Sequence, residues 1–166
     1  MSAPLRIQVP VQTQVPNNQE DKIGREDKSA LVCCHEPSYL EYLTGQLRGI
    51  GYKVHHAAGH QVAIQRLQGR SYDLTVLLEN LEGCALVENA LWQHLGSTLT
   101  DERRQTFVVM LCQSFNTGDE MYAYALSVDQ LINYQDIGQF AQLLVPAVEE
   151  HTEGNRHFTA ALRKAA

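Results

Sequence analysis

The stretch Asp73-Leu74-Thr75-Val76-Leu77-Leu78-Glu79 lies near the middle of the chain and is almost wholly apolar between its two acids. A continuous apolar run of this length is typical of a strand buried on both faces, as in a parallel sheet covered by helices. Turn-forming residues at 79–83 then end it. Ligands of open α/β sheets bind outside the carboxyl ends of the strands, so the segment 78–83 is expected to border any functional site.

Similar short apolar runs occur on both sides of this strand and are separated by segments with helical periodicity. Strands are predicted at 30–34, 52–57, 107–112 and 130–133. Helices are predicted at 37–49, 59–67, 84–95 and 119–126, with a polar connection at 96–105. Strand and helix alternate five times, which predicts an α/β fold: a parallel sheet with helices on both faces.

The last predicted helix contains a residue that should disturb it. Asp136 is placed to cap this helix, whose apolar stripe runs to Val148. Pro146 lies inside and removes one backbone donor, so it is expected to bend the helix. Residues 147–150 should therefore diverge from the sheet.

The C-terminal tail is expected to be a separate short helix. Residues 151–154 should break the preceding helix, and 155–164 can form another, with Phe158 and Leu162 on its apolar side. A short helix is marginal alone, so its own domain or a partner chain must cover that side.

Composition fits one domain with tails. The chain has 166 residues, 44% of them hydrophobic, and a net charge of -6. We expect a disordered or extended tail at 1–28, a domain at 29–150 and a helical tail at 151–166; the Val/Gln alternation at 8–16 could instead add an edge strand to a partner. No apolar run reaches the ~20 residues of a membrane span, no signal peptide is recognisable, and the acidic balance argues against nucleic acid. A cytoplasmic protein with reduced cysteines is expected.

Two segments resemble the receiver domain of bacterial response regulators. Residues 31–37, Leu-Val-Cys-Cys-His-Glu-Pro, look like a receiver's first strand and its acid-acid-Glu-Pro turn. Residues 72–78, Tyr-Asp-Leu-Thr-Val-Leu-Leu, look like the third strand, which in receivers ends on the phosphorylated aspartate. The resemblance covers about 29–150. It implies a flavodoxin-like, doubly wound five-stranded sheet of order 2-1-3-4-5 and a role in two-component signalling through protein partners.

The residues that receivers use for phosphoryl transfer are replaced. In receivers two acids hold Mg²⁺, an aspartate is the nucleophile, and a hydroxyl and a lysine contact the phosphoryl group. The corresponding positions here are Cys34 and His35 for the acid pair, Leu78 for the acceptor, Cys112 for the hydroxyl and Asn133 for the lysine. The resemblance is therefore to a degenerate member, a pseudo-receiver. It is expected to be no enzyme and to need no metal or cofactor.

Glu79 leaves one alternative open at the acceptor position. A bulge that shifts the strand by one residue would place Glu79 there, where its carboxylate could mimic a permanently phosphorylated state. Successive strand residues point to opposite faces, so Leu78 and Glu79 cannot share one role. The other interpretation is a solvated acid at a strand end.

Thiols and imidazoles raise the question of a metal site. Thiolates and imidazole are good Zn²⁺ ligands, and four such side chains are predicted near the carboxyl edge of the sheet: Cys34, His35, Cys84 and Cys112. No short paired spacing supports zinc, and small apolar side chains filling a former phosphate site are the simpler interpretation. His55, His56 and His60 could form a second cluster or a pH-sensitive patch, or be solvated.

The function that best fits these observations is a phosphorylation-independent interaction module. In receivers the face made by the fourth helix, fifth strand and fifth helix docks partners, and the matching segment is 119–148. Candidate contact residues, including two from the tail, are Met121, Tyr122, Tyr124, Gln130, Gln139, Phe158 and Leu162. A homodimer is possible, and neither nucleic acid nor membrane is an expected partner. The alternatives are a thiol- or metal-dependent site, or a small-ligand sensor, at Cys34, His35 and Cys112.

Overall fold

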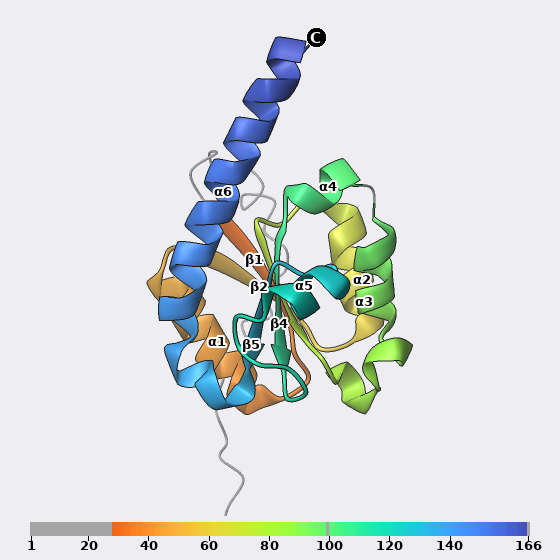
Figure 1. Ribbon diagram of the computed structural model, residues 1–166. Coiled ribbons are helices and arrows are strands. Elements are labelled where there is room, and N and C mark those ends of the chain that lie inside the picture. Colours follow the sequence, from red (N-terminus) through yellow and green to blue (C-terminus); the bar gives the residue numbers. More distant parts are fainter. Residues whose placement is uncertain (1–27, 99, 166) are drawn as a thin grey trace, which may run out of the picture.

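The protein is a five-stranded α/β fold in which all strands are parallel. The computed structural model describes residues 28–98 and 100–165. The predicted N-terminal tail at 1–28 therefore lies outside the described residues, except for Lys28. The sheet order is β2-β1-β3-β4-β5, which confirms the predicted fold class and strand order (Figure 1). The strands are β1 (Lys28–Cys33), β2 (Tyr52–Ala57), β3 (Leu74–Leu78), β4 (Phe107–Cys112) and β5 (Gln130–Asn133).

The central strand β3 is buried along its whole length, as its apolar run predicts. It pairs with β1 through Val32 and Val76 and with β4 through Val76 and Val109. The Asp73 carboxylate precedes β3 and accepts the Ser29 backbone N–H at 2.8 Å, which joins the amino ends of two strands. This register brings the carboxyl ends of β1, β3, β4 and β5 to one edge of the sheet.

Helices cover both faces of the sheet. On one face α1 and α6 lie together, and on the other α2 packs against α3 (Figure 1). The helices are α1 (Pro37–Gly49), α2 (His60–Gly69), α3 (Ala90–Ser97), α4 (Thr100–Arg104), α5 (Glu120–Ala125) and α6 (Phe140–Ala165). Among the described helices, none combines the length and apolarity that crossing a membrane requires.

The segment after β3 differs from the predicted helix at 84–95. Two 3-10 turns, Leu81–Gly83 and Leu86–Glu88, come before α3, which begins only at Ala90. Asn89 caps the start of α3, because its Oδ1 accepts the Trp92 N–H at 2.9 Å. Its side chain is fully buried, and its Nδ2 donates to the Leu78 carbonyl at 3.3 Å. The predicted polar connection at 96–105 also contains a helix, α4.

The residue predicted to cap the last helix does not cap it. A 3-10 turn, Tyr134–Gln139, leads into α6, and Asn133 caps that turn by accepting the Gln135 N–H at 3.0 Å. Asp136 instead accepts a hydrogen bond from the Thr117 hydroxyl at 2.6 Å. The predicted Asp136 cap is wrong because this carboxylate is held by a loop on the other side of β5.

The last helix is one continuous helix of 26 residues, so the predicted break at 151–154 is wrong. Pro146 lies inside it and is exposed. Because proline has no backbone N–H, the carbonyl one turn earlier has no helical donor, and water can bind this carbonyl instead. Ala147 and Val148 pack against the core, so the predicted divergence after Pro146 is also wrong. Further on, the side chains of His151 and Asn155 each donate to the Arg104 carbonyl, at 3.0 and 2.7 Å. These long-range contacts hold the helix straight through the segment expected to break it.

Candidate functional site

The carboxyl edge of the sheet holds a pocket of about 430 Å³. Its lining comes from the ends of β3 and β5, the start of α1 and the loops between them: Glu36, Tyr39, Leu78, Asn80, Gln113, Asn133, Tyr134 and Gln135. Amides and tyrosines dominate this lining, and its charged member is the carboxylate Glu36. Cys34, His35 and Cys112, the residues expected to form a reactive or ligand-binding site, do not line it.

At the end of β1, the side chains of Cys34 and His35 form hydrogen bonds with backbone groups. The Cys34 side chain is buried and its Sγ donates to the Glu36 carbonyl at 3.2 Å. Burial is the main cause that raises the pKa of this thiol. The His35 Nδ1 accepts the Glu82 backbone N–H at 3.1 Å, which joins the β1–α1 loop to the turn after β3. Neither side chain provides the hard oxygen ligands that Mg²⁺ prefers.

At the end of β3, Leu78 and Glu79 have different surroundings. Leu78 is buried at the floor of the pocket. The Glu79 carboxylate leaves the strand and accepts two backbone N–H groups directly after β4, those of Gln113 at 2.9 Å and Ser114 at 3.3 Å. Glu79 is therefore not simply a solvated acid, because it fastens the loop that follows β4.

The turn after β3 has a backbone that a proline could not adopt. Glu82 has φ of 58° in the left-handed region, whereas proline requires about −65°. Its carboxylate lies against Gly59, where an added Cβ would clash with Oε1, and its Oε2 is 3.4 Å from the His60 Nε2.

At the ends of β4 and β5, Cys112 and Asn133 stabilise the loop 113–117. Cys112 is buried, and burial is the main cause that raises its pKa to about 11. The Asn133 Nδ2 donates to the Phe115 carbonyl at 2.9 Å and its backbone N–H donates to the Thr117 hydroxyl at 2.8 Å. Among the described residues that line this pocket, none is a Lys or Arg.

Two tyrosines that the sequence did not indicate form one wall of the pocket. Tyr39 and Tyr134 stack with ring centroids 5.4 Å apart, and the Tyr134 hydroxyl donates to the Asn80 Oδ1 at 3.0 Å. Burial is the main cause that raises the pKa of Tyr134, and the neighbouring Tyr39 also raises it. The sequence does place an aromatic residue, Tyr134, directly after the predicted strand at 130–133, and this could have indicated an aromatic wall at that edge of the sheet.

The cysteines and histidines do not assemble into a metal centre among the described residues. His55 pairs with the Tyr72 hydroxyl at 2.9 Å, His56 with the Cys34 carbonyl at 2.8 Å, and His60 with the Leu81 carbonyl at 3.1 Å. These are three separate contacts to three separate partners. Cys84 is half-buried in the turn after β3. The second histidine cluster considered from the sequence is not formed.

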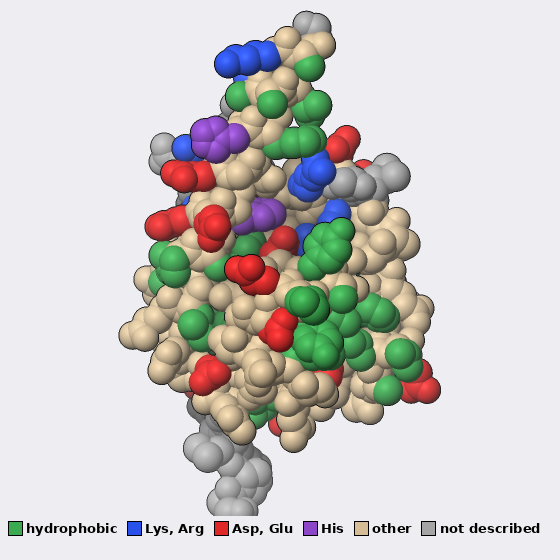
Figure 2. All heavy atoms as spheres, in the orientation of Figure 1, with side chains coloured by type: hydrophobic (Ala, Val, Ile, Leu, Met, Phe, Trp, Pro, Cys, Tyr) green, Lys and Arg blue, Asp and Glu red, His purple; other side chains and the backbone are tan. Residues whose placement is uncertain are grey.

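The candidate interaction residues fall on two neighbouring surfaces. On α5, Met121 is 80% and Tyr124 88% exposed, with Tyr122 beside them, and Figure 2 shows a hydrophobic patch over this helix. On the far half of α6, Phe158 and Leu162 are exposed. The remaining candidates differ from each other: Gln139 is exposed, whereas Gln130 is half-buried and its Nε2 donates to the Leu143 carbonyl at 3.1 Å.

Solved structures of receiver domains are similar to this chain over most of its length. A putative response regulator from Chloroflexus aurantiacus J-10-fl is 15% identical, with a TM-score of 0.61, and the match covers 75% of this chain and 99% of that one. A CheY-like response regulator receiver domain protein from Methanospirillum hungatei JF-1 is 14% identical, with a TM-score of 0.61 and coverage of 76% and 98%. The signal receiver domain of an HD domain-containing protein from Pseudomonas fluorescens Pf-5 is 16% identical, with a TM-score of 0.58 and coverage of 78% and 92%.

The sequence comparisons add no relative to this set. No family model matches the chain, and no curated protein matches it. At identities this low the likeness to solved structures concerns the fold alone.

Proposed function

We propose that this chain, which has the fold of a response-regulator receiver domain, is a non-enzymatic interaction module of bacterial cytoplasmic signalling that works without phosphorylation. The observation that carries the proposal is the position of Leu78. It is buried at the floor of the carboxyl-edge pocket, at the end of β3, where a receiver presents its nucleophilic carboxylate. A leucine side chain has no group that could accept a phosphoryl group.

The surroundings of Leu78 support the same conclusion. A phosphoryl group brings negative charge that enzymes neutralise with metal ions and cationic side chains. Here the pocket lining offers the carboxylate Glu36, and the amide Asn133 stands at the lysine position. A thiol-dependent alternative is disfavoured because the thiolate is the reactive species, and burial raises the pKa of both Cys34 and Cys112.

Incubation with acetyl phosphate and Mg²⁺ tests this proposal directly. We expect the intact mass of the protein to remain unchanged, because Leu78 has no nucleophilic group and because Cys34 and His35 are not the hard oxygen ligands that Mg²⁺ prefers. A receiver domain that retains its aspartate serves as the positive control. A stoichiometric, acid-labile phosphoryl adduct on this chain would refute the proposal.

Glu79 can supply the charge that phosphorylation would otherwise bring. Its carboxylate accepts hydrogen bonds from Gln113 and Ser114, directly after Cys112 at the end of β4. In receivers a hydroxyl at that strand end reads the phosphoryl state, so a fixed carboxylate here would hold the following loop in one state. Charge-assisted hydrogen bonds of this kind are about twice as strong as neutral ones.

Replacing Glu79 by alanine should loosen the loop after β4. We expect the amide hydrogens of Gln113 and Ser114 to exchange roughly tenfold faster or more, because each loses a charge-assisted acceptor. Glu79→Gln, which keeps an acceptor oxygen without the charge, should give exchange rates between those of the parent chain and of Glu79→Ala. Hydrogen exchange followed by NMR gives the rates, and Glu36→Ala is the matched control. Unchanged protection at both amides in Glu79→Ala would contradict the proposed role.

The interaction surface of this module is proposed to lie on α5, β5 and α6. Met121, Tyr122 and Tyr124 expose large side chains on α5. Aromatic and methionine side chains are enriched at protein interfaces, and contiguous exposed apolar patches commonly mark them. A protein partner, including a second copy of the chain, fits this surface better than a nucleic acid, because the groove between α5, β5 and α6 is lined by four acids and, among the described residues, by no Lys or Arg.

A further inference from the structure

A groove of about 800 Å³ lies at the amino ends of the strands, on the opposite edge of the sheet from the carboxyl-edge pocket. Tyr52 and Phe107, the first residues of β2 and β4, line one wall and are themselves buried. The far half of α6 lines the other wall, and Figure 1 shows it extending past the edge of the sheet where β1 begins. The groove therefore has one apolar wall in the domain and one helical wall that overhangs it.

The charged side chains of this groove are mainly basic. Lys28, Arg156 and Arg163 line it, and none of the three forms an ion pair with any described residue. Asp73 is the one acid in the described lining, and its carboxylate already accepts the Ser29 backbone N–H at 2.8 Å. Three cations without ionic partners beside an apolar wall are complementary to an acidic, partly apolar chain segment.

A segment of this composition is attached directly at the groove. Residues 1–27 lie outside the described residues and join the described chain at Lys28. The last eight of them, at 20–27, read Glu-Asp-Lys-Ile-Gly-Arg-Glu-Asp, with four acids, two bases and one large apolar residue. Covalent attachment by a short linker gives a segment an effective concentration on the order of millimolar. A free acidic partner would have to compete with this segment for the groove.

We propose that residues 20–27 lie along the far half of α6 of their own molecule and fill this groove as a strap. The acids of the strap pair with Arg156 and Arg163, and Ile23 packs into the groove between them. This inference goes beyond the proposed function, which concerns the carboxyl edge of the sheet and the α5–β5–α6 face.

The lengths of the two segments agree with this arrangement. Over the roughly twelve residues before Arg163, α6 rises about 18 Å at about 1.5 Å per residue. An extended chain covers about 3.3 Å per residue, so the six residues before Lys28 span about 20 Å. Running outward from Lys28, the acids at 26–27 come level with Arg156, and those at 20–21 come within reach of the long Arg163 side chain.

The helical wall of the groove is preformed. His151 and Asn155 both line the groove and fasten α6 to the Arg104 carbonyl, at 3.0 and 2.7 Å. Elements that are ordered in advance lose less entropy when a segment binds to them. Further along the same wall, Thr159 and Ala160 are small, which leaves space for the Ile23 side chain.

Cross-linking within the full chain tests this strap. One variant carries Ile23→Cys and Ala160→Cys, and its matched control carries Ile23→Cys and Leu162→Cys. Ala160 lines the groove, whereas Leu162 is exposed and does not line it, since two residues along a helix point about 200° apart. A tail without a preferred site would reach both positions equally. We expect a short bismaleimide to link the first pair at least roughly tenfold faster, within one molecule.

Charge reversal tests the ion pairs of the strap. Adding Arg156→Glu and Arg163→Glu to the first variant should remove most of its rate advantage, because like charges then face each other. Replacing the four acids of 20–27 by lysine as well should restore the advantage. Peptide masses after proteolysis identify the linked cysteines and separate them from products of the half-buried Cys84.

Three results would overturn the inference. Equal linking rates for the two cysteine pairs would leave the groove to a foreign acidic partner. A linked product of twice the chain mass would mean that the segment comes from a second copy. A rate advantage that survives the arginine reversals would mean that the ion pairs do not form. Circular dichroism confirms that each variant is folded, and phosphoryl transfer is measured separately by mass, so failure of the strap and failure of the proposed function are distinguishable.

Discussion

Leu78→Asp is expected to destabilise the fold by roughly 3–5 kcal/mol at neutral pH, because it removes a buried leucine and places a carboxylate in its apolar site. Leu78 is 1% exposed on the central strand of the sheet. The introduced aspartate should also fail to become phosphorylated, since Cys34, His35 and Asn133 supply neither the Mg²⁺-binding acids nor the cation that phosphoryl transfer uses. Urea unfolding and the acetyl phosphate assay measure the two effects.

The pH dependence of this variant identifies the cause. Burial raises the pKa of an introduced carboxyl group, so the folded state binds more protons than the unfolded state. Stability then falls as pH rises above the unfolded value of about 3.9. Leu78→Asn has the same shape without the charge and should show no such slope. Parallel pH profiles for the two variants would mean that the aspartate is solvated, and an acid-labile adduct would mean that a working site remains.

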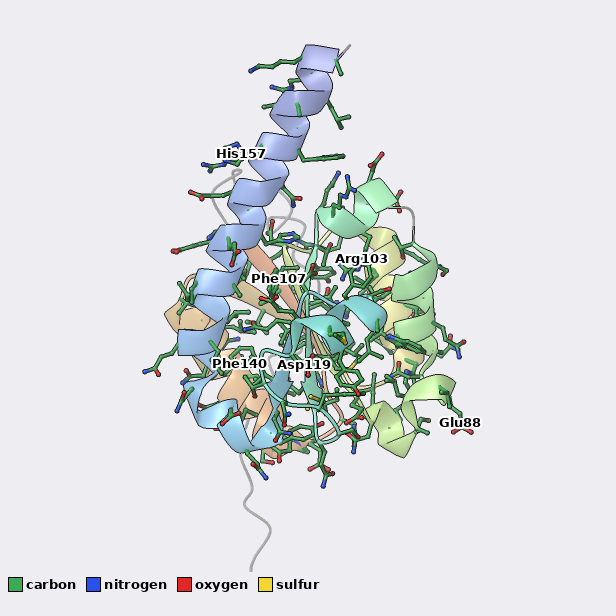
Figure 3. All side chains as sticks on the ribbon, viewed as in Figure 1. Glu88, Arg103, Phe107, Asp119, Phe140 and His157 are labelled. Atoms are coloured by element: carbon green, nitrogen blue, oxygen red, sulfur yellow. The ribbon has the colours of Figure 1, made fainter. Side chains whose placement is uncertain are left out.

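Phe140→Ala is expected to destabilise the protein by roughly 3–5 kcal/mol, the usual cost of removing a fully buried aromatic side chain. Phe140 is the first residue of α6 and is 0% exposed; Figure 3 shows it at the base of that helix. Val145→Ala, on the exposed side of the same helix, should change stability by less than about 0.5 kcal/mol. Urea midpoints at constant m-value compare the two. Equal effects would mean that α6 is not anchored at its first turn.

The strands could be predicted from the sequence because their apolar character is local. The runs at Leu74–Leu78 and Phe107–Cys112 are continuous, and their burial follows from composition without knowledge of any partner. The sheet order needed the resemblance to receivers as well. The absence of a phosphorylation site stays a prediction, which the resemblance to receivers allowed to be made position by position from residue types.

The helix boundaries could not be predicted, because distant contacts decide them. α3 begins late because Asn89 is drawn into the core by the Leu78 carbonyl. α6 continues through Gly154 because His151 and Asn155 reach Arg104, which is about fifty residues earlier in the chain. The Glu79 contact with the loop after β4 and the Tyr39–Tyr134 wall were missed for the same reason. Each joins segments that are far apart in the sequence and meet only at one edge of the folded sheet.

The continuity of α6 makes it a mechanical lever. Its 26 residues at about 1.5 Å each give a rod about 39 Å long, with its fulcrum at Phe140. A rotation of about 5° at that fulcrum would carry the far end through roughly 3 Å, by the same rise per residue. That displacement is comparable to the length of a hydrogen bond. A slight repacking around β5 would therefore be enough to align or misalign Arg163 and Lys164, at the other end of the helix, with the charges of a binding partner.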